Sequence, residues 1–257
     1  MVNIGPGSLW SLPLEFFPKL KSIEIRGSDN LEALSASDES LLDLISLTKL
    51  TIKFCPNFVS FPSGGLCAPN LTQISILDCK KLKSLAEGMH TLLPSLLYLK
   101  LWRCPELESF PEGGLPSNLQ ILEIVSCDKL FLRRMEWGLQ SLHSLREIEI
   151  WYDGREVGSF PEEALLPPSL IRLNITFPHL TSLNGRGFQH LTLLKQLEIW
   201  NCDNLQRLPE EGFPASLSIL EIWKCPLLKK RYRRKNGKEW RKISHIPIIR
   251  IDNEVIT

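Results

Sequence analysis

The sequence has no apolar run of the roughly 18–20 residues that a membrane-spanning helix needs. Its first residues, MVNIGPGSLWSLPLEFF, lack the basic start and apolar stretch of a secretory signal. It also lacks an excess of charge, since 30 Lys and Arg stand against 29 Asp and Glu. We therefore expect no membrane and no nucleic acid as partner. The expected location is the cytoplasm, with the nucleus as an alternative.

Enzyme motifs are missing as well. The sequence contains no G-x-x-x-x-G-K-[ST] phosphate loop, no G-x-S-x-G elbow and no H-E-x-x-H zinc motif. Its five histidines are scattered. The seven cysteines include no C-x2–4-C pair, so neither a zinc site nor a secreted disulfide framework is indicated. The sequence predicts a protein that is not an enzyme and needs no cofactor and no metal.

The sequence does contain one motif that is repeated along the chain, with the template L-x-x-L-x-I-x-x-C-x-x-L-x-x-L. Nine copies begin at Leu20, Leu47, Leu71, Leu96, Leu119, Leu145, Leu170, Leu194 and Leu217. The starts lie 23 to 27 residues apart, within the range of leucine-rich repeats. A motif that recurs this often indicates architecture rather than a single reactive site.

The period within each copy predicts the fold. In YLKLW, Leu99 and Leu101 face one way, while Tyr98, Lys100 and Trp102 face the other. Each unit thus offers one short strand whose apolar side is covered only when units stack. We predict an α/β leucine-rich-repeat solenoid, a horseshoe with a concave parallel sheet of about nine strands and an irregular or short-helical convex side.

Pro- and Gly-rich segments alternate with other return segments. FPSGGL, FPEGGL, FPEEAL and LPEEGF recur every 48 to 50 residues, and we expect them to be free of helix. The intervening return segments around 85–99, 135–145 and 183–194 have room for a single helical turn. The predicted array is therefore a repeat of pairs.

Six cysteines occupy the same slot just after the strand, where the chain turns inward: Cys55, Cys79, Cys104, Cys127, Cys202 and Cys225. Ser28 and Asp153 take the slot in two other units. A small side chain that tolerates burial and offers a weak hydrogen bond suits this place. We interpret these cysteines as structural.

The outward strand positions supply the candidate binding surface. Four of the seven tryptophans fall in one outward column, beside a column rich in glutamate. Exposed aromatic residues ringed by charge are typical of binding hot spots. The alternative is that the rings pack along the strands and only stabilise the sheet. The residues assigned to partner binding are Tyr98, Lys100, Trp102, Glu149, Trp151, Glu198, Trp200, Glu221 and Trp223.

The predicted organisation has three parts. Residues 1–19 form a partial N-terminal repeat or flank, residues 20–228 the array, and residues 229–257 a basic C-terminal cap. The cap begins with nine Lys or Arg against Glu239 alone. Its isoleucines Ile246, Ile248, Ile249 and Ile251 are expected to close the core. Because the leucine spacing of the repeats has already begun at Leu12, we also expect that an upstream piece is missing or is supplied in another version of the chain.

The C-terminal stretch, LEIWNCDNLQRLPEEGFPASLSILEIWKCPLLKK and the following KISHIPIIRID, resembles plant intracellular nucleotide-binding, leucine-rich-repeat immune receptors of the coiled-coil class. The FPEGGLPSNLQ turns share this resemblance, which extends from about Leu12 onward. It implies a module that binds proteins: a pathogen effector, a host protein that effectors target, or the receptor's own nucleotide-binding domain. The nucleotide-binding portion itself has no counterpart in these residues. The alternative function is a substrate adaptor of an F-box ubiquitin ligase.

Overall fold

The computed structural model describes residues 2–4, 10–16, 18–35, 44–154, 157–232 and 238–256. Two compact units, Met1–Gly138 and Leu139–Thr257, make up the chain. We call them unit 1 and unit 2.

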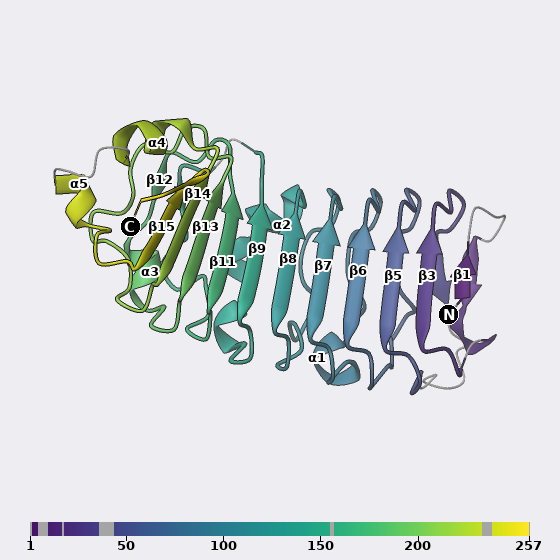
Figure 1. The fold of residues 1–257 in the computed structure, drawn as a ribbon. Helices are drawn as coiled ribbons and strands as arrows, with labels where there is room; N and C mark the ends of the chain where they lie inside the picture. Colours follow the sequence, from purple (N-terminus) through teal and green to yellow (C-terminus); the bar gives the residue numbers. More distant parts are fainter. Residues whose placement is uncertain are drawn as a thin grey trace. The chain divides into compact units, whose positions relative to one another are not determined.

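Unit 1 carries a parallel sheet in which the repeat strands follow one another in chain order (Figure 1). Its strands are β1 (Val2–Ile4), β3 (Ser22–Arg26), β5 (Lys49–Lys53), β6 (Gln73–Leu77), β7 (Tyr98–Trp102) and β8 (Ile121–Val125). Leu50, Ile74, Leu99 and Leu122 are register partners from strand to strand. One position of the template therefore always meets the same position of the next repeat.

Unit 2 is built in the same way. Its parallel strands are β9 (Glu147–Trp151), β11 (Arg172–Thr176), β13 (Gln196–Trp200), β14 (Ile219–Trp223) and β15 (Ile248–Ile251). A final strand, β16 (Glu254–Val255), pairs with β15 in the antiparallel direction. The nine strands expected from the nine copies of the template are confirmed as β3, β5, β6, β7, β8, β9, β11, β13 and β14.

The core lies between the sheet and the return segments of each unit. On β7, Leu99 and Leu101 are fully buried, whereas the alternate residues are only half-buried. Leu96 and Leu107, from the segments that flank the strand, are also fully buried. Each such side chain contributes about 1.5–3 kcal/mol on leaving water. The fold is a leucine-rich-repeat solenoid, as the sequence predicts.

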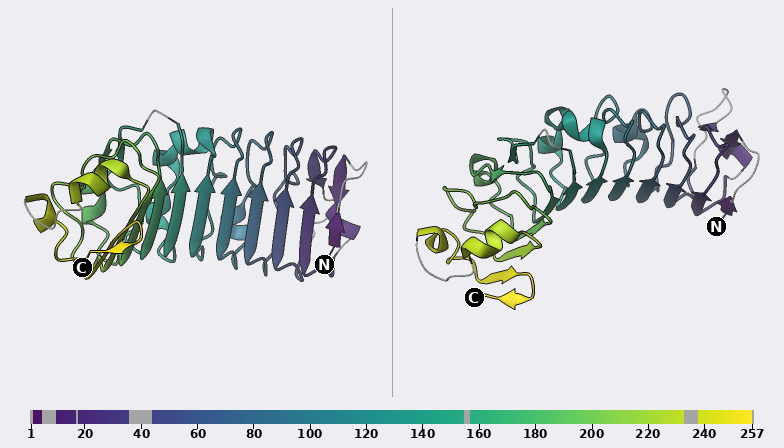
Figure 2. Two further views of the ribbon diagram at one scale, coloured as in Figure 1. Left: turned by 45° about the horizontal axis from the view of Figure 1, so that its top comes forward. Right: turned by 90° about the horizontal axis from the view of Figure 1, so that it is seen from above.

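The return segments lie on one side of the strands in each unit, as Figure 2 shows. They hold the short helices α1 (Met89–Leu92), α2 (Asp128–Leu132), η1 (Leu14–Phe16), η2 (Arg134–Glu136), η3 (Leu139–Ser141) and α3 (Arg186–Gln189). Two small parallel sheets join return segments, β2 (Ser11–Pro13) with β4 (Ala33–Ser35) and β10 (Ser159–Phe160) with β12 (Ser182–Leu183). The predicted single turns are confirmed at α1, η3 and α3, and the FPEGG-type segments contain no helix.

The C-terminal residues continue the core of unit 2. Helices α4 (Pro226–Tyr232) and α5 (Lys238–Arg241) precede β15. Of the isoleucines named above, Ile246, Ile249 and Ile251 are buried, and Ile248 is half-buried. The division of the chain at residues 19 and 228 stays a prediction. In the part of the chain that the structure describes, no helix has the length and apolar character needed to cross a membrane.

Candidate partner-binding surface

The outward side chains of the strands form what we call the outer sheet face, the face turned away from the return segments. In unit 1 it includes the Tyr98, Lys100 and Trp102 assigned from the sequence. In unit 2 it includes Glu149, Trp151, Glu198, Trp200, Glu221 and Trp223. All nine assigned residues therefore lie on this face.

In unit 1 the three assigned residues gather around Glu123 of β8. The Tyr98 hydroxyl donates a 2.8 Å hydrogen bond to Glu123 Oε1, and Lys100 Nζ lies 2.5 Å from Glu123 Oε2. Lys100 Nζ also lies 4.9 Å from the centre of the Trp102 ring. This cluster already satisfies its own charges, since the lysine is held by both a carboxylate and an aromatic face.

In unit 2 two assigned tryptophans stack on each other. The rings of Trp200 and Trp223 are 5.2 Å apart between centroids and inclined by 16°. Each indole N–H donates to the glutamate two residues earlier on its strand, Trp200 to Glu198 at 3.0 Å and Trp223 to Glu221 at 3.3 Å. These bonds tie each ring to the glutamate of its own strand and use one lone pair of each carboxylate.

Neighbouring side chains complete this cluster. Gln196 donates a 2.8 Å hydrogen bond to Glu198 Oε1, and Arg250 of β15 lies 2.5 Å from Glu221 Oε1. Glu221 is only 9% exposed. The charge of Glu221 is thus balanced by Arg250, whereas Glu198 accepts its hydrogen bonds from the neutral donors Gln196 and Trp200.

Glu149 and Trp151 stand two strands away from this cluster. Between them and β13 lies β11, whose Asn174 and Thr176 are the register partners of both neighbouring strands. Trp151 is 38% exposed, while Thr176 is buried at 8%. The Asn174 Oδ1 atom is buried without a hydrogen-bond partner among the described residues.

The structure shows where the assigned residues lie, and their role in binding stays a prediction. The ring stacking and the cation over Trp102 also agree with the stabilising alternative, and the two roles are compatible. The assignment omitted Glu123, Gln196 and Arg250, which hold its members in place. Glu123 could have been found from the sequence, because Lys100 and Glu123 are opposite charges at the same strand position of consecutive repeats.

The six cysteines that follow the strands each donate a hydrogen bond from the thiol to a backbone carbonyl, which supports their predicted structural role. Each of the six is at most 1% exposed. The Cys104 thiol donates to the carbonyl of Trp102 at 3.5 Å and lies 3.9 Å from that of Ile76 on the preceding strand. Burial raises the pKa of the Cys79 thiol, so it stays protonated at neutral pH. No group of three or more His, Cys, Asp or Glu suited to a metal ion exists among the described residues.

The assignment of Asp153 to this slot is wrong, because Asp153 is exposed. Tyr152, one residue earlier, is buried at 2% and fills the place. The units with Cys or Ser in the slot share a residue of positive φ just before it, such as Arg103 at 52°. Tyr152 is not among the residues with positive φ, so the chain enters the core directly after β9 with a large aromatic side chain.

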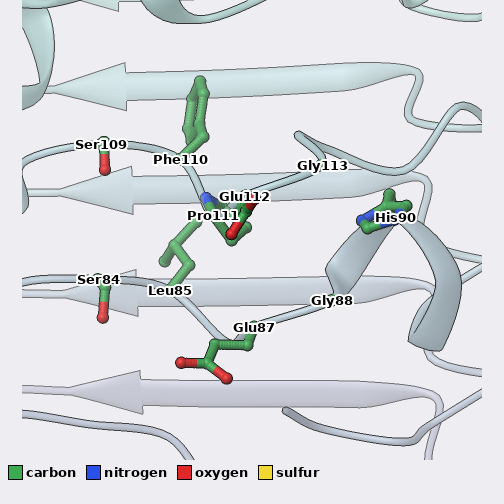
Figure 3. A pocket seen from close by; sticks show the side chains of 10 residues that line it. All are labelled: Ser84, Leu85, Glu87, Gly88, His90, Ser109, Phe110, Pro111, Glu112 and Gly113. Carbon is green, nitrogen blue, oxygen red and sulfur yellow. The ribbon is translucent and has the colours of Figure 1, made fainter. Parts of the chain in front are cut away.

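The return side of unit 1 carries a groove of about 750 Å³ between the segments that follow β6 and β7 (Figure 3). It is lined by Ser84, Leu85, Glu87, Gly88, His90, Ser109, Phe110, Pro111, Glu112 and Gly113. His90, Glu87 and Glu112 are exposed. Among these lining residues no hydrogen bond joins His90 to either serine, so the groove shows no nucleophile and base in contact.

The fold and the outer sheet face define a leucine-rich-repeat recognition module. The chain is 41% identical to the Arabidopsis thaliana protein named "Putative disease resistance protein At3g14460" over 251 residues, which are 97% of its own length. Over 187 residues, 68% of this chain, it is 27% identical to the TMV resistance protein N of Nicotiana glutinosa. The matches confirm the resemblance to plant disease resistance proteins. The chain spans only 17% and 15% of the length of these two relatives.

A solved structure supports the fold alone. The leucine-rich repeat domain of the type III effector XopL superposes with a TM-score of 0.55 at 23% identity, covering 86% of this chain and 75% of that one. No family model matches the sequence.

Proposed function

We propose that this chain is the protein-recognition part of a plant intracellular immune receptor, and that it binds pathogen effector or host proteins through its outer sheet face. Its action is binding rather than catalysis. In the longer receptor the same repeats restrain a nucleotide-binding domain until a partner binds. The proposed location is the cytoplasm.

One observation carries the proposal: the chain matches a plant disease resistance protein over 97% of its length, within a repeat fold whose outward side chains cluster as aromatic and charged groups. An interface core enriched in aromatic residues and bordered by charge is the usual composition of a binding hot spot. The ubiquitin-ligase adaptor has no comparable observation in its favour, since both relatives named above are resistance proteins.

The test compares the two sides of the same unit by photo-crosslinking. The full chain carries p-benzoylphenylalanine either at Trp151 on the outer sheet face or at Leu193 on the return side, which is 49% exposed. Both versions are exposed to extract of infected leaf tissue and irradiated. We expect defined crosslinked proteins from position 151, at several times the yield from position 193. Equal yields, or crosslinks mainly from position 193, would overturn the proposed binding face.

A further inference from the structure

The groove on the return side of unit 1 is built by matching residues of two consecutive repeats. Ser84 and Ser109 are β-bridge partners, and the Glu108 N–H donates to the Lys83 carbonyl at 3.0 Å, so backbone pairing holds the two return segments together at this end. Eight of the lining residues form pairs 25 positions apart in the chain: Ser84 and Ser109, Leu85 and Phe110, Glu87 and Glu112, and Gly88 and Gly113.

His90 of α1 closes the other end of the groove. Figure 3 shows its ring at the end opposite to the two serines. The ring packs over Gly113, since a Cβ atom added at Gly113 would lie 2.1 Å from it. The His90 ring therefore reports on any molecule that enters this end of the groove.

The floor between the two ends is apolar. Leu85 is only 3% exposed, and Phe110 and Pro111 are half-buried. Phe110 also contacts the buried Trp137, with 5.8 Å between the ring centroids. The volume of about 750 Å³ lies within the range of roughly 300–1,000 Å³ that is usual for ligand pockets. An occupant that lays an alkyl chain on this floor removes apolar surface from water.

The charged residues of the groove have one sign. Glu87 and Glu112 are exposed, and neither carboxylate has an ion pair in the described part of the chain. No Lys or Arg is among the ten lining residues. Glu106 and Glu108, earlier in the same return segment as Glu112, are by contrast both paired with Lys129. Two carboxylates beside an apolar floor are thus left for a positive charge from outside.

We propose that this groove binds a lysine side chain from an extended segment of a partner protein, with the alkyl chain on Leu85 and Pro111 and the ammonium group at Glu87 and Glu112. Lysine places its four-carbon chain on apolar surface while its charged end stays at the rim. Its ammonium group is a compact charge with three rotatable donors, so it can bond carboxylates from two segments, whereas the planar guanidinium of arginine matches one carboxylate best. The groove is a second surface, distinct from the outer sheet face of the proposed function.

The test titrates the full chain with the pentapeptide acetyl-Ser-Ala-Lys-Ala-Ser-amide and with its ε-acetyl-lysine counterpart, which keeps the alkyl chain and lacks the charge. The five histidines carry ¹³C in their rings, and the NMR signal of His90 is assigned with His90→Gln. We expect the His90 signal to move with the lysine peptide and to stay in place with the acetylated one. Equal shifts with both peptides, or no shift with the lysine peptide, would overturn the inference. Tighter binding of the corresponding arginine peptide would overturn the choice of lysine.

Variants of the two carboxylates locate the site. Glu87→Gln and Glu112→Gln should each weaken binding of the lysine peptide by about two- to fivefold, the range for one exposed ion pair. Both changes together should remove the preference for lysine over acetyl-lysine. Glu136→Gln is the matched control, because Glu136 of η2 is exposed on the return side of unit 1 and does not line the groove.

All three glutamates are exposed, so the glutamine variants should fold as the wild type does, which circular dichroism checks. A preference for lysine that survives the double change, or that is lost equally in Glu136→Gln, would contradict the proposed site. Neither result bears on the proposed function, which the crosslinks from position 151 test.

Discussion

At the scale of the residue, the cysteines serve the backbone. Cys225 shows the pattern: its thiol donates to the carbonyl of Trp223 at 3.3 Å and accepts from the backbone N–H of Cys202 at 3.4 Å. A thiol is small enough to be buried at every turn and makes both contacts without demanding a strong partner. Because Cys225 is only 1% exposed, a reagent in solution does not reach its thiol while the protein is folded.

The slot cysteines should therefore resist alkylation. Iodoacetamide reacts with the thiolate, and burial raises the pKa of Cys79 and Cys55, so the thiolate fraction at pH 8 falls below that of an ordinary thiol. Cys67 lies outside the slot and is half-buried. We expect Cys67 to react first, with the slot cysteines on the order of 100-fold slower until the protein is denatured. Timed labelling and peptide mass spectrometry measure this, and labelling of Cys79 at the rate of Cys67 would contradict it.

A second prediction at this scale concerns Gly113, beside the groove. It has φ of +82°, and an added Cβ would lie 2.1 Å from the His90 ring. Gly114 has φ of +81° with nothing within 4 Å. Gly114→Ala should cost roughly 1–2 kcal/mol from backbone strain alone. Gly113→Ala should cost about 0.5–1 kcal/mol more, because the exposed His90 ring must also turn aside.

His90→Ala separates these two costs. Urea unfolding of the single and double variants should show that the difference between Gly113→Ala and Gly114→Ala disappears once His90 is alanine. An undiminished difference would show that the ring is not what Gly113 accommodates.

At the scale of the element, the sequence predicted the strands well because their burial follows from a period of two that is repeated nine times. Leu99 in β7 and Leu197 in β13 are fully buried where the template places them. The small sheet of β10 and β12 escaped prediction, since it pairs only two residues from each of two irregular segments. Asp153 was misplaced because counting from Leu145 cannot reveal that Tyr152 enters the core one residue early.

The candidate surface was predictable as a set of outward positions but not as a set of contacts. Alternation alone shows that Trp200 and Trp223 point outward. Whether they stack on each other or stand apart depends on side-chain angles that a pattern does not contain. Arg250, which pairs with Glu221, comes from a strand beyond the nine template copies, so no repeat alignment brings it next to that residue.

The prediction at the scale of the element concerns Asp252, which follows β15 at the C-terminal end of the repeat sheet. The Lys224 N–H donates to Asp252 Oδ1 at 2.8 Å, at a position where the corresponding Asn201 N–H bonds a carbonyl of the next strand. Lys229 of α4 bonds the other oxygen at 2.5 Å. Asp252→Asn should lower the free energy of unfolding by about 1 kcal/mol, a modest value because Lys229 is partly exposed and screened.

The shifted pKa of Asp252 determines how this difference in unfolding free energy changes with pH. The hydrogen bond from Lys229, followed by that from the Lys224 backbone, holds the pKa of Asp252 below its usual range. Its contribution is therefore present above the unfolded pKa of about 3.9 and is lost as the pH falls through the lower folded value. Wild type and Asp252→Asn should differ in urea unfolding at pH 6, and the difference should shrink progressively as the pH falls below about 3.9. A gap that stays constant with pH would show that the charge contributes nothing.

At the scale of the whole molecule, the repeat strands within each unit pair with the strands before and after them in chain order. The stability of such an array is approximately a sum of local terms, so damage to one repeat spreads to its neighbours first. The candidate binding surface is assembled in the same local way. Its two clusters, around Glu123 in unit 1 and around Glu198 in unit 2, are each assembled from consecutive strands.

Leu197→Asp tests this locality. Leu197 is fully buried between its register partners Leu173 and Leu220, so a carboxylate there is placed in the core without a partner and costs several kcal/mol. Hydrogen exchange followed by mass spectrometry should show β11, β13 and β14 losing protection while β5, β6 and β7 keep it. Gln196→Ala, on the outer sheet face of the same strand, is the control and should leave all six strands protected. Equal loss in β5–β7 would mean that the array unfolds as one cooperative body, because nearest-neighbour coupling alone cannot carry the damage from β13 to β5.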